Sequence, residues 1–206
     1  MSYLFNNWEK VGALFGEHVL LTFTSLGMAL LFAFPIGFLV AKYRRLHTPV
    51  TGMLGIVYTI PSMALYAALI PYTGLGVKTA TIGLVAYAQM ILVRNIISAI
   101  KGIDPMMLEA AKGMGMSKWQ IVWKIEMPLS VPVILAGIRI ATVSIISIGT
   151  IAAWIGGGGL GTLIFQGLNH QHTGKIIAGT IAITLLAIAA DGLFRLIEKL
   201  LRPKLA

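Results

Sequence analysis

Charged side chains inside long apolar stretches are the residues of this sequence best suited to do chemistry. Arg94, Arg139 and Asp191 each stand in a run of otherwise apolar residues. An ionised side chain at the centre of a membrane helix costs roughly 2.5–3.5 kcal/mol on insertion scales, so it usually faces a protein interior or water. These residues therefore mark either a polar path for a solute or ion pairs between helices. Arg94 is close enough to the end of its run to reach the headgroups.

Arg139 has two interpretations that the sequence leaves open. It lies deep in its apolar run, where it either pairs with Asp191 or lines the gate of a translocation path. Asp191 has another candidate partner in Arg195, four residues further along the same predicted helix.

Further candidates for a path or gate are neutral polar residues and residues that interrupt helices. Gln89 and Asn95 either hydrogen-bond between helices or line the path. Pro61 predicts a kink that frees a backbone carbonyl. Gly157 and Gly158 belong to the run WIGGGGLG, which predicts a flexible loop on the outer side, either an outer-gate hinge or a re-entrant turn.

Motifs for enzymatic chemistry are missing from the sequence. It has no phosphate-binding loop, no G-x-S-x-G, no H-E-x-x-H and no cysteine. His170 and His172 lack a third ligand and are expected to be solvated loop residues. We expect no catalytic residue, no metal site and no cofactor bound by this chain. A small membrane enzyme or assembly scaffold is the remote alternative, and would need a catalytic cluster at one membrane depth.

The elements that carry these residues are predicted to be membrane-spanning helices. The chain has 206 residues, of which 57% are hydrophobic and only 11% charged, whereas soluble domains average about 25% charged. Its apolar stretches are too long and too uniform for barrel strands. The sequence predicts an all-α integral membrane protein, a single domain over 1–206 with five spans, at about 19–41, 50–70, 79–100, 129–154 and 176–196.

The positive charges indicate how these spans are oriented. The formal net charge is +9, but the basic residues are divided among loops, which argues against nucleic acid as a partner. One side collects most of them: Lys42, Arg44, Arg45, Lys101, Lys112, Lys118, Lys124, Arg195, Lys199, Arg202 and Lys204. The other side has only Lys10, Lys78 and Lys175. The positive-inside rule then places the N-terminus outside and the C-terminus in the cytoplasm.

The polar segment 101–127 is predicted to form two short helices at the inner membrane surface. Asp104-Pro105 is typical of a helix start, and a glycine bend is expected near Gly113 or Gly115. Ser117 and Gln120 form a capping box that begins a second helix, which is expected to stop before Pro128.

This segment is either an amphipathic connector or a docking element for a cytoplasmic partner. The small residues Ala110, Ala111, Gly113 and Gly115 would let a partner approach closely. Glu109 would offer one charge to a basic groove.

The same residues resemble the EAA motif of bacterial ABC-importer permeases, the MetI-like family. Glu109-Ala110-Ala111, then Gly115, then Ile125-x-x-Pro128 follow the family pattern, with Met127 in place of its leucine. The resemblance implies that this segment is the coupling helix, formed by Glu109, Ala110, Ala111, Gly113, Gly115 and Pro128. It also implies partners: cytoplasmic ABC ATPase subunits that use ATP, a second permease subunit and an extracytoplasmic solute-binding protein, in a bacterial plasma membrane.

A narrower resemblance concerns the solute. The runs GLGVKTATIGL, VRNIISAIKGID and AAWIGGGGLGTLIFQGL are similar to the osmoprotectant subgroup of these permeases. That subgroup imports glycine betaine, carnitine and choline. The alternative is another small solute, such as ergothioneine or an amino acid.

Overall fold

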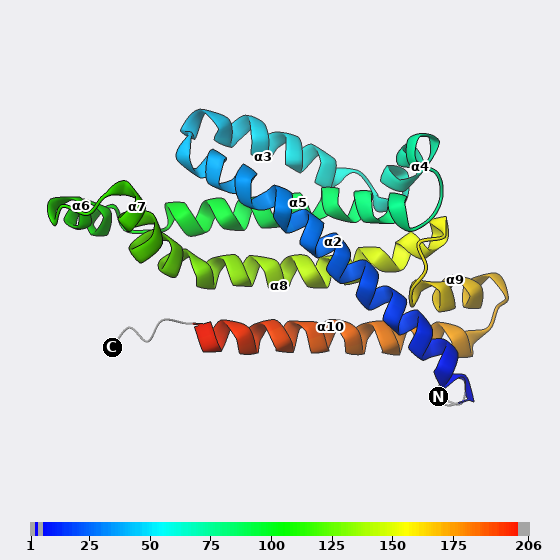
Figure 1. Cartoon of the computed structure of the whole chain (residues 1–206). Coiled ribbons are helices and arrows are strands. Elements are labelled where there is room, and N and C mark those ends of the chain that lie inside the picture. Colours follow the sequence, from blue (N-terminus) through cyan, green and yellow to red (C-terminus); the bar gives the residue numbers. More distant parts are fainter. Residues whose placement is uncertain (1–2, 4–5, 202–206) are drawn as a thin grey trace.

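The structure, a computed structural model, describes residue 3 and residues 6–201 and shows a bundle of long helices (Figure 1). Two residues of the predicted basic side, Arg202 and Lys204, lie outside the described part. The long helices are α2 (Trp8–Lys42), α3 (Arg44–Thr59), α5 (Val77–Lys101), α8 (Met127–Ala152) and α10 (Thr173–Leu201). The shorter ones are α4 (Ser62–Thr73), α6 (Pro105–Gly113), α7 (Lys118–Ile121) and α9 (Gly161–Asn169), with a π-helical turn at Val122–Glu126 and a 3-10 turn at Ala153–Ile155.

The described residues confirm an all-helical membrane fold. Four helical stretches are long and apolar enough to cross a membrane, at Trp8–Lys42, Val77–Lys101, Lys118–Ile155 and Thr173–Leu201. The pair α3 and α4 makes a fifth if it is counted as one span. The first helix begins well before the predicted residue 19, because the polar residues that precede the apolar run continue it.

The predicted second span, 50–70, is not one helix. The chain bends by 97° between α3 and α4, at the proline where the sequence predicts only a kink. Ile60 has extended dihedrals, φ −66° and ψ 128°, because the ring of Pro61 excludes helical geometry from the residue before it. The carbonyl oxygen of Ile60 accepts a hydrogen bond from the Tyr87 hydroxyl of α5, so the backbone group freed by the break is satisfied.

Helix α5 is the centre of the bundle. In the most apolar 18-residue stretch of α5, 56% of the residues are buried, against 28% in the corresponding stretch of α10. Buried residues of α2, α5 and α8 form one continuous apolar cluster. Small residues allow these close contacts, as is usual between membrane helices. A Cβ atom at Gly37 would overlap Ile96 of α5, and one at Gly137 would overlap Asn95.

The polar segments gather at the two ends of the bundle. The α2–α3 turn, the α6–α7 segment and the end of α10 lie at one end, and the starts of α2, α5 and α10 lie at the other (Figure 1). The described basic residues of the predicted cytoplasmic side therefore share one end of the molecule, as the alternation of loops predicts.

Candidate functional site

Helix α6 has local signals at both ends. The Asp104 side chain accepts a hydrogen bond from the Met106 amide at 2.9 Å, and Pro105 occupies the first turn. At the other end the Met116 amide donates to the Ala111 carbonyl at 3.1 Å and the Gly115 amide donates to Lys112 at 2.9 Å. This bond pair is a Schellman motif, and Gly115 holds the left-handed position with φ +78°. The predicted helix start and glycine bend are both confirmed.

The second short helix begins as predicted but does not stop before Pro128. Ser117 and Gln120 form the complete capping box. The helix then passes through the π-helical turn Val122–Glu126 into α8, with Pro128 in the first turn of α8. The wider turn accommodates the missing amide of Pro128 without ending the helix. The result is one helical stretch, Lys118–Ile155.

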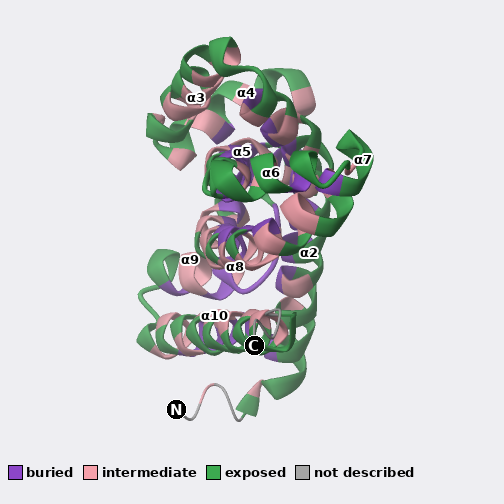
Figure 2. Ribbon diagram, turned by 90° about the vertical axis from the view of Figure 1, so that its left-hand side faces the viewer, coloured by how far each residue is buried: buried purple, intermediate pink, exposed green. Residues whose placement is uncertain are grey.

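The residues of the EAA-like segment fall into two groups by exposure. Ala111 is completely buried, whereas Glu109, Ala110, Gly113 and Gly115 are exposed. Figure 2 shows α6 as mostly exposed. A Cβ atom on Gly113 or Gly115 would meet nothing within 4 Å. Ala110 and Pro128, though distant in sequence, line one pocket of about 410 Å³ together with Met107 and Met114. The segment thus presents a small-residue surface at the end of the bundle.

Arg139 makes ion pairs with a neighbouring helix. Its Nε lies 3.5 Å from Asp191 Oδ1, and its Nη1 lies 3.5 Å from Glu198 Oε2. Arg195, which is 67% exposed, also pairs with Asp191 at 2.6 Å. Arg139 therefore makes the ion pair with Asp191 that the sequence offers as one alternative, and both predicted partners of Asp191 are present. The contact with Glu198 was not predicted.

The two neutral polar candidates of α5 lie at helix crossings. Gln89 is buried, and its Nε2 donates to the Ala29 carbonyl of α2 at 3.0 Å. Asn95 donates to Ile91 within α5 at 2.8 Å and packs where α8 places Gly137. The Gln89 amide nitrogen and the Asn95 side chain therefore have partners within this chain, whereas the buried Oε1 of Gln89 has no hydrogen-bond partner among the described residues.

The glycine run after α8 is held by hydrogen bonds. The Gly157 amide donates to Ala152 at 2.9 Å and the Gly156 amide to Ala153 at 3.1 Å, a second Schellman motif. The Gly159 amide donates to Glu17 Oε2 of α2 at 2.9 Å. Gly158 and Gly159 both have φ +74°. Gly157 and Gly158 thus lie in a turn that hydrogen bonds join to the end of α8 and to α2.

His18, next to Glu17, also contacts α8 and the glycine run. Its ring is fully buried, and Nε2 lies 3.1 Å from the Ile146 carbonyl of α8. A Cβ atom on Gly159 would lie 2.8 Å from His18 Nδ1. Glu17, His18 and Tyr87 are not among the residues predicted from the sequence. The adjacent polar pair at the start of a long apolar run was the available signal for the first two.

We expect Gly159→Ala to unfold the protein at a lower temperature. The new methyl group would meet His18 Nδ1, and φ +74° is unfavourable for alanine. Gly16→Ala is the matched control, because a Cβ atom there meets nothing and alanine favours a helix by about 1 kcal/mol. Thermal unfolding in detergent checks both; equal midpoints would contradict the close contact.

Tyr87→Phe is expected to destabilise the break at Pro61. The substitution leaves the partly buried Ile60 carbonyl without its donor, and a typical hydrogen bond contributes about 0.5–1.5 kcal/mol. The control is Tyr58→Phe, because Tyr58 contacts the Tyr87 ring edge-on at 5.9 Å and is more exposed. Unfolding midpoints that fall equally for both variants would show that the loss does not come from the bond to the Ile60 carbonyl.

His170 and His172 lie in the turn between α9 and α10. Among the described residues no group of three or more His, Cys, Asp or Glu side chains could hold a metal. His172 is exposed and its Nδ1 accepts a hydrogen bond from the Lys175 amide at 3.3 Å, in the first turn of α10.

Together these features define a class: a multi-pass helical membrane protein with a projecting helix–glycine–helix segment at one end. The fold matches the MetNI methionine ABC transporter in an inward facing conformation, with a TM-score of 0.81 over 90% of this chain and 93% of that chain, at 21% identity.

The chain belongs to the family of binding-protein-dependent transport system inner membrane components, whose model matches residues 33–203. It is a permease subunit of an ABC import system. It is 36% identical to the glycine betaine/carnitine/choline transport system permease protein OpuCB of Bacillus subtilis, over 99% of this chain and 94% of the relative. It is also 36% identical to the osmoprotectant import permease protein OsmW of Salmonella typhimurium, over 98% and 96%.

Proposed function

We propose that this chain forms the membrane path of an importer for osmoprotectants of the quaternary ammonium type, such as glycine betaine, carnitine and choline. Support comes from relatives named for these solutes that align over nearly the whole chain. The fold neighbour named for methionine shares only 21% identity, so it supports the architecture and not an amino-acid substrate.

The α6 segment is proposed to be the docking site of a cytoplasmic ATPase. The observation that carries this assignment is the exposed, unobstructed surface of Glu109, Ala110, Gly113 and Gly115 at the basic end of the bundle. That end is accordingly assigned to the cytoplasm and the N-terminus to the outside. ATP would be bound and hydrolysed by the partner, since this sequence has no phosphate-binding loop.

Motion of α6 would be carried by the continuous helix 118–155. At 1.5 Å per residue this stretch is roughly 57 Å long, enough to cross the membrane. Its far end is the glycine turn pinned by Glu17. A partner that moves α6 would act on this stretch through the short turn at Gly115, and through the stretch on the glycine turn at its far end. A second permease copy or paralogue would complete the path, and a separate binding protein would deliver the solute at the outer loops.

Two experiments test these assignments separately. Tagged chain purified from its native membrane should bring an ABC ATPase with it. Uptake of labelled glycine betaine, carnitine or choline should be lost when the gene is deleted and restored by the wild-type chain. Ergothioneine and an amino acid form the other arms of the uptake panel. If one of these is the only solute whose uptake is lost, the osmoprotectant assignment is overturned while the ATPase assignment stands.

A further inference from the structure

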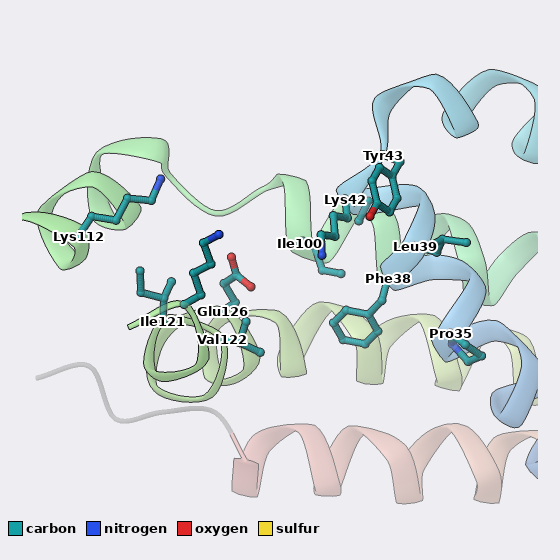
Figure 3. Close-up of a pocket in the computed structure, with 12 residues that line it drawn as sticks. Pro35, Phe38, Leu39, Lys42, Tyr43, Ile100, Lys112, Ile121, Val122 and Glu126 are labelled. Carbon is teal, nitrogen blue, oxygen red and sulfur yellow. The ribbon is translucent and has the colours of Figure 1, made fainter. Parts of the chain in front are cut away.

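A pocket of about 730 Å³ opens where three parts of the chain meet at the basic end of the bundle (Figure 3). Its walls come from the last turns of α2, the end of α5 and the α6–α7 segment with the π-helical turn. Neither the ion pairs of Arg139 nor the exposed coupling surface accounts for this pocket.

One part of the lining is cationic. Lys42, Lys112 and Lys118 line the pocket together with a single carboxylate, Glu126, which leaves two positive charges in excess. Figure 3 shows Lys42 and Lys112 extending toward the pocket from opposite sides. Lys42 Nζ lies 5.6 Å from the centre of the Tyr43 ring, a cation–π contact that positions the ammonium group.

The rest of the lining is apolar. Its residues are Pro35, Phe38, Leu39, Ala41, Ile100, Ile121 and Val122. A ligand that satisfies both parts must join an anionic group to a hydrocarbon portion. A simple inorganic anion would leave the apolar wall empty, and a neutral lipid would leave the lysines without a counter-charge.

The aromatic residues around the pocket are of the kinds that collect at the membrane–water interface. Tyr43 lines it directly, and Trp119 and Trp123, on the same short segment as Lys118, are 70% and 54% exposed and stack edge to face. Tryptophan and tyrosine concentrate at the level of the lipid headgroups. Basic pockets between membrane helices at the cytoplasmic surface bind anionic headgroups.

We propose that this pocket is a binding site for an anionic glycerophospholipid. The phosphate lies among Lys42, Lys112 and Lys118, and an acyl chain lies along Phe38, Leu39 and Ile100. The lipid bridges α2 and the α6–α7 segment. The proposal depends on the pocket's chemistry and not on the transported solute.

Native mass spectrometry of the full-length permease in detergent tests this site. The probes are phosphatidylglycerol and phosphatidylcholine with identical acyl chains, and glycerol 3-phosphate as the soluble headgroup. Lys42→Gln combined with Lys118→Gln should weaken phosphatidylglycerol binding roughly thirtyfold, given the attraction of two lysines for an anionic lipid surface. The matched control is Arg45→Gln combined with Lys101→Gln. Both residues lie at the same end of the bundle but outside the pocket lining, so this variant should bind phosphatidylglycerol like the wild type.

Three outcomes would overturn the proposal: equal weakening in the control, equal binding of phosphatidylcholine, or glycerol 3-phosphate binding as tightly as the lipid. If the double variant does not fold, Lys42→Gln alone should weaken phosphatidylglycerol binding roughly fivefold. Because lipid binding is measured without ATPase or solute, failure here leaves the transport assignment untouched.

Discussion

Replacing Gly113 by tryptophan is expected to abolish ATP-driven uptake while the permease stays folded in the membrane. Gly113 is the last residue of α6, and a side chain there meets nothing within 4 Å in the chain itself. The substitution is therefore tolerated by the permease but not by a partner whose surface lies against α6. We expect ATPase association to weaken at least tenfold, which corresponds to about 1.4 kcal/mol.

The control for this variant is Gly12→Trp. Gly12 lies near the start of α2, at the opposite end of the bundle, and is equally unobstructed. It adds the same bulk without approaching α6. Co-purification of the ATPase and uptake in vesicles measure both effects. If Gly113→Trp and wild type recover equal ATPase, α6 is a connector and not the docking element.

Gly115→Ala probes a different property of the same surface. Because Gly115 has φ +78°, alanine strains the Schellman turn even without a partner. A loss seen with Gly115→Ala alone would therefore report the turn, whereas a loss with Gly113→Trp reports the partner.

Arg139→Met is expected to cause the largest loss of folded permease. It removes the guanidinium group that lies 3.5 Å from both Asp191 and Glu198. These two carboxylates of α10 then lose their ion pair with α8. These two contacts are partly buried ion pairs that join α8 to α10, so their loss weakens the packing of the two helices. We expect a clear fall in the unfolding midpoint and in the yield of folded protein.

Arg195→Met is the matched control for the ion-pair network. Arg195 also pairs with Asp191 but is 67% exposed, and exposed pairs contribute about 0–1 kcal/mol. Its loss should change stability little. If Arg139→Met unfolds like wild type but fails to transport, Arg139 acts on the path and the helix-packing role is contradicted.

Local signals in the sequence predicted the local structure well. The Asp104 cap, the Gly115 turn and the Ser117–Gln120 capping box each depend on residues within a few positions of one another, and each is present. The pairing of Arg139 with Asp191 was one of two alternatives because both were isolated charges in apolar runs, and such charges seek each other.

Features that depend on distant parts of the chain could not be predicted in the same way. Glu17 and Gly159 are 142 positions apart, and nothing in either local sequence indicates the other. Pro61 indicates a break, but the 97° bend depends on the packing of α4 and on Tyr87 of α5. Pro128 by itself predicts that the helix ends. The helix continues because a π-helical turn precedes Pro128.

The most direct test of the account is uptake into proteoliposomes that contain this permease with its ATPase and binding protein. When ATP is supplied on the side of the membrane where the ATPase lies, labelled glycine betaine, carnitine or choline should accumulate on that side. Replacing ATP by a non-hydrolysable analogue should stop this accumulation. Gly113→Trp should reduce accumulation to the level seen with the analogue. Accumulation that proceeds equally with the analogue, or that is unchanged in Gly113→Trp, would contradict an ATP-driven permease coupled through α6.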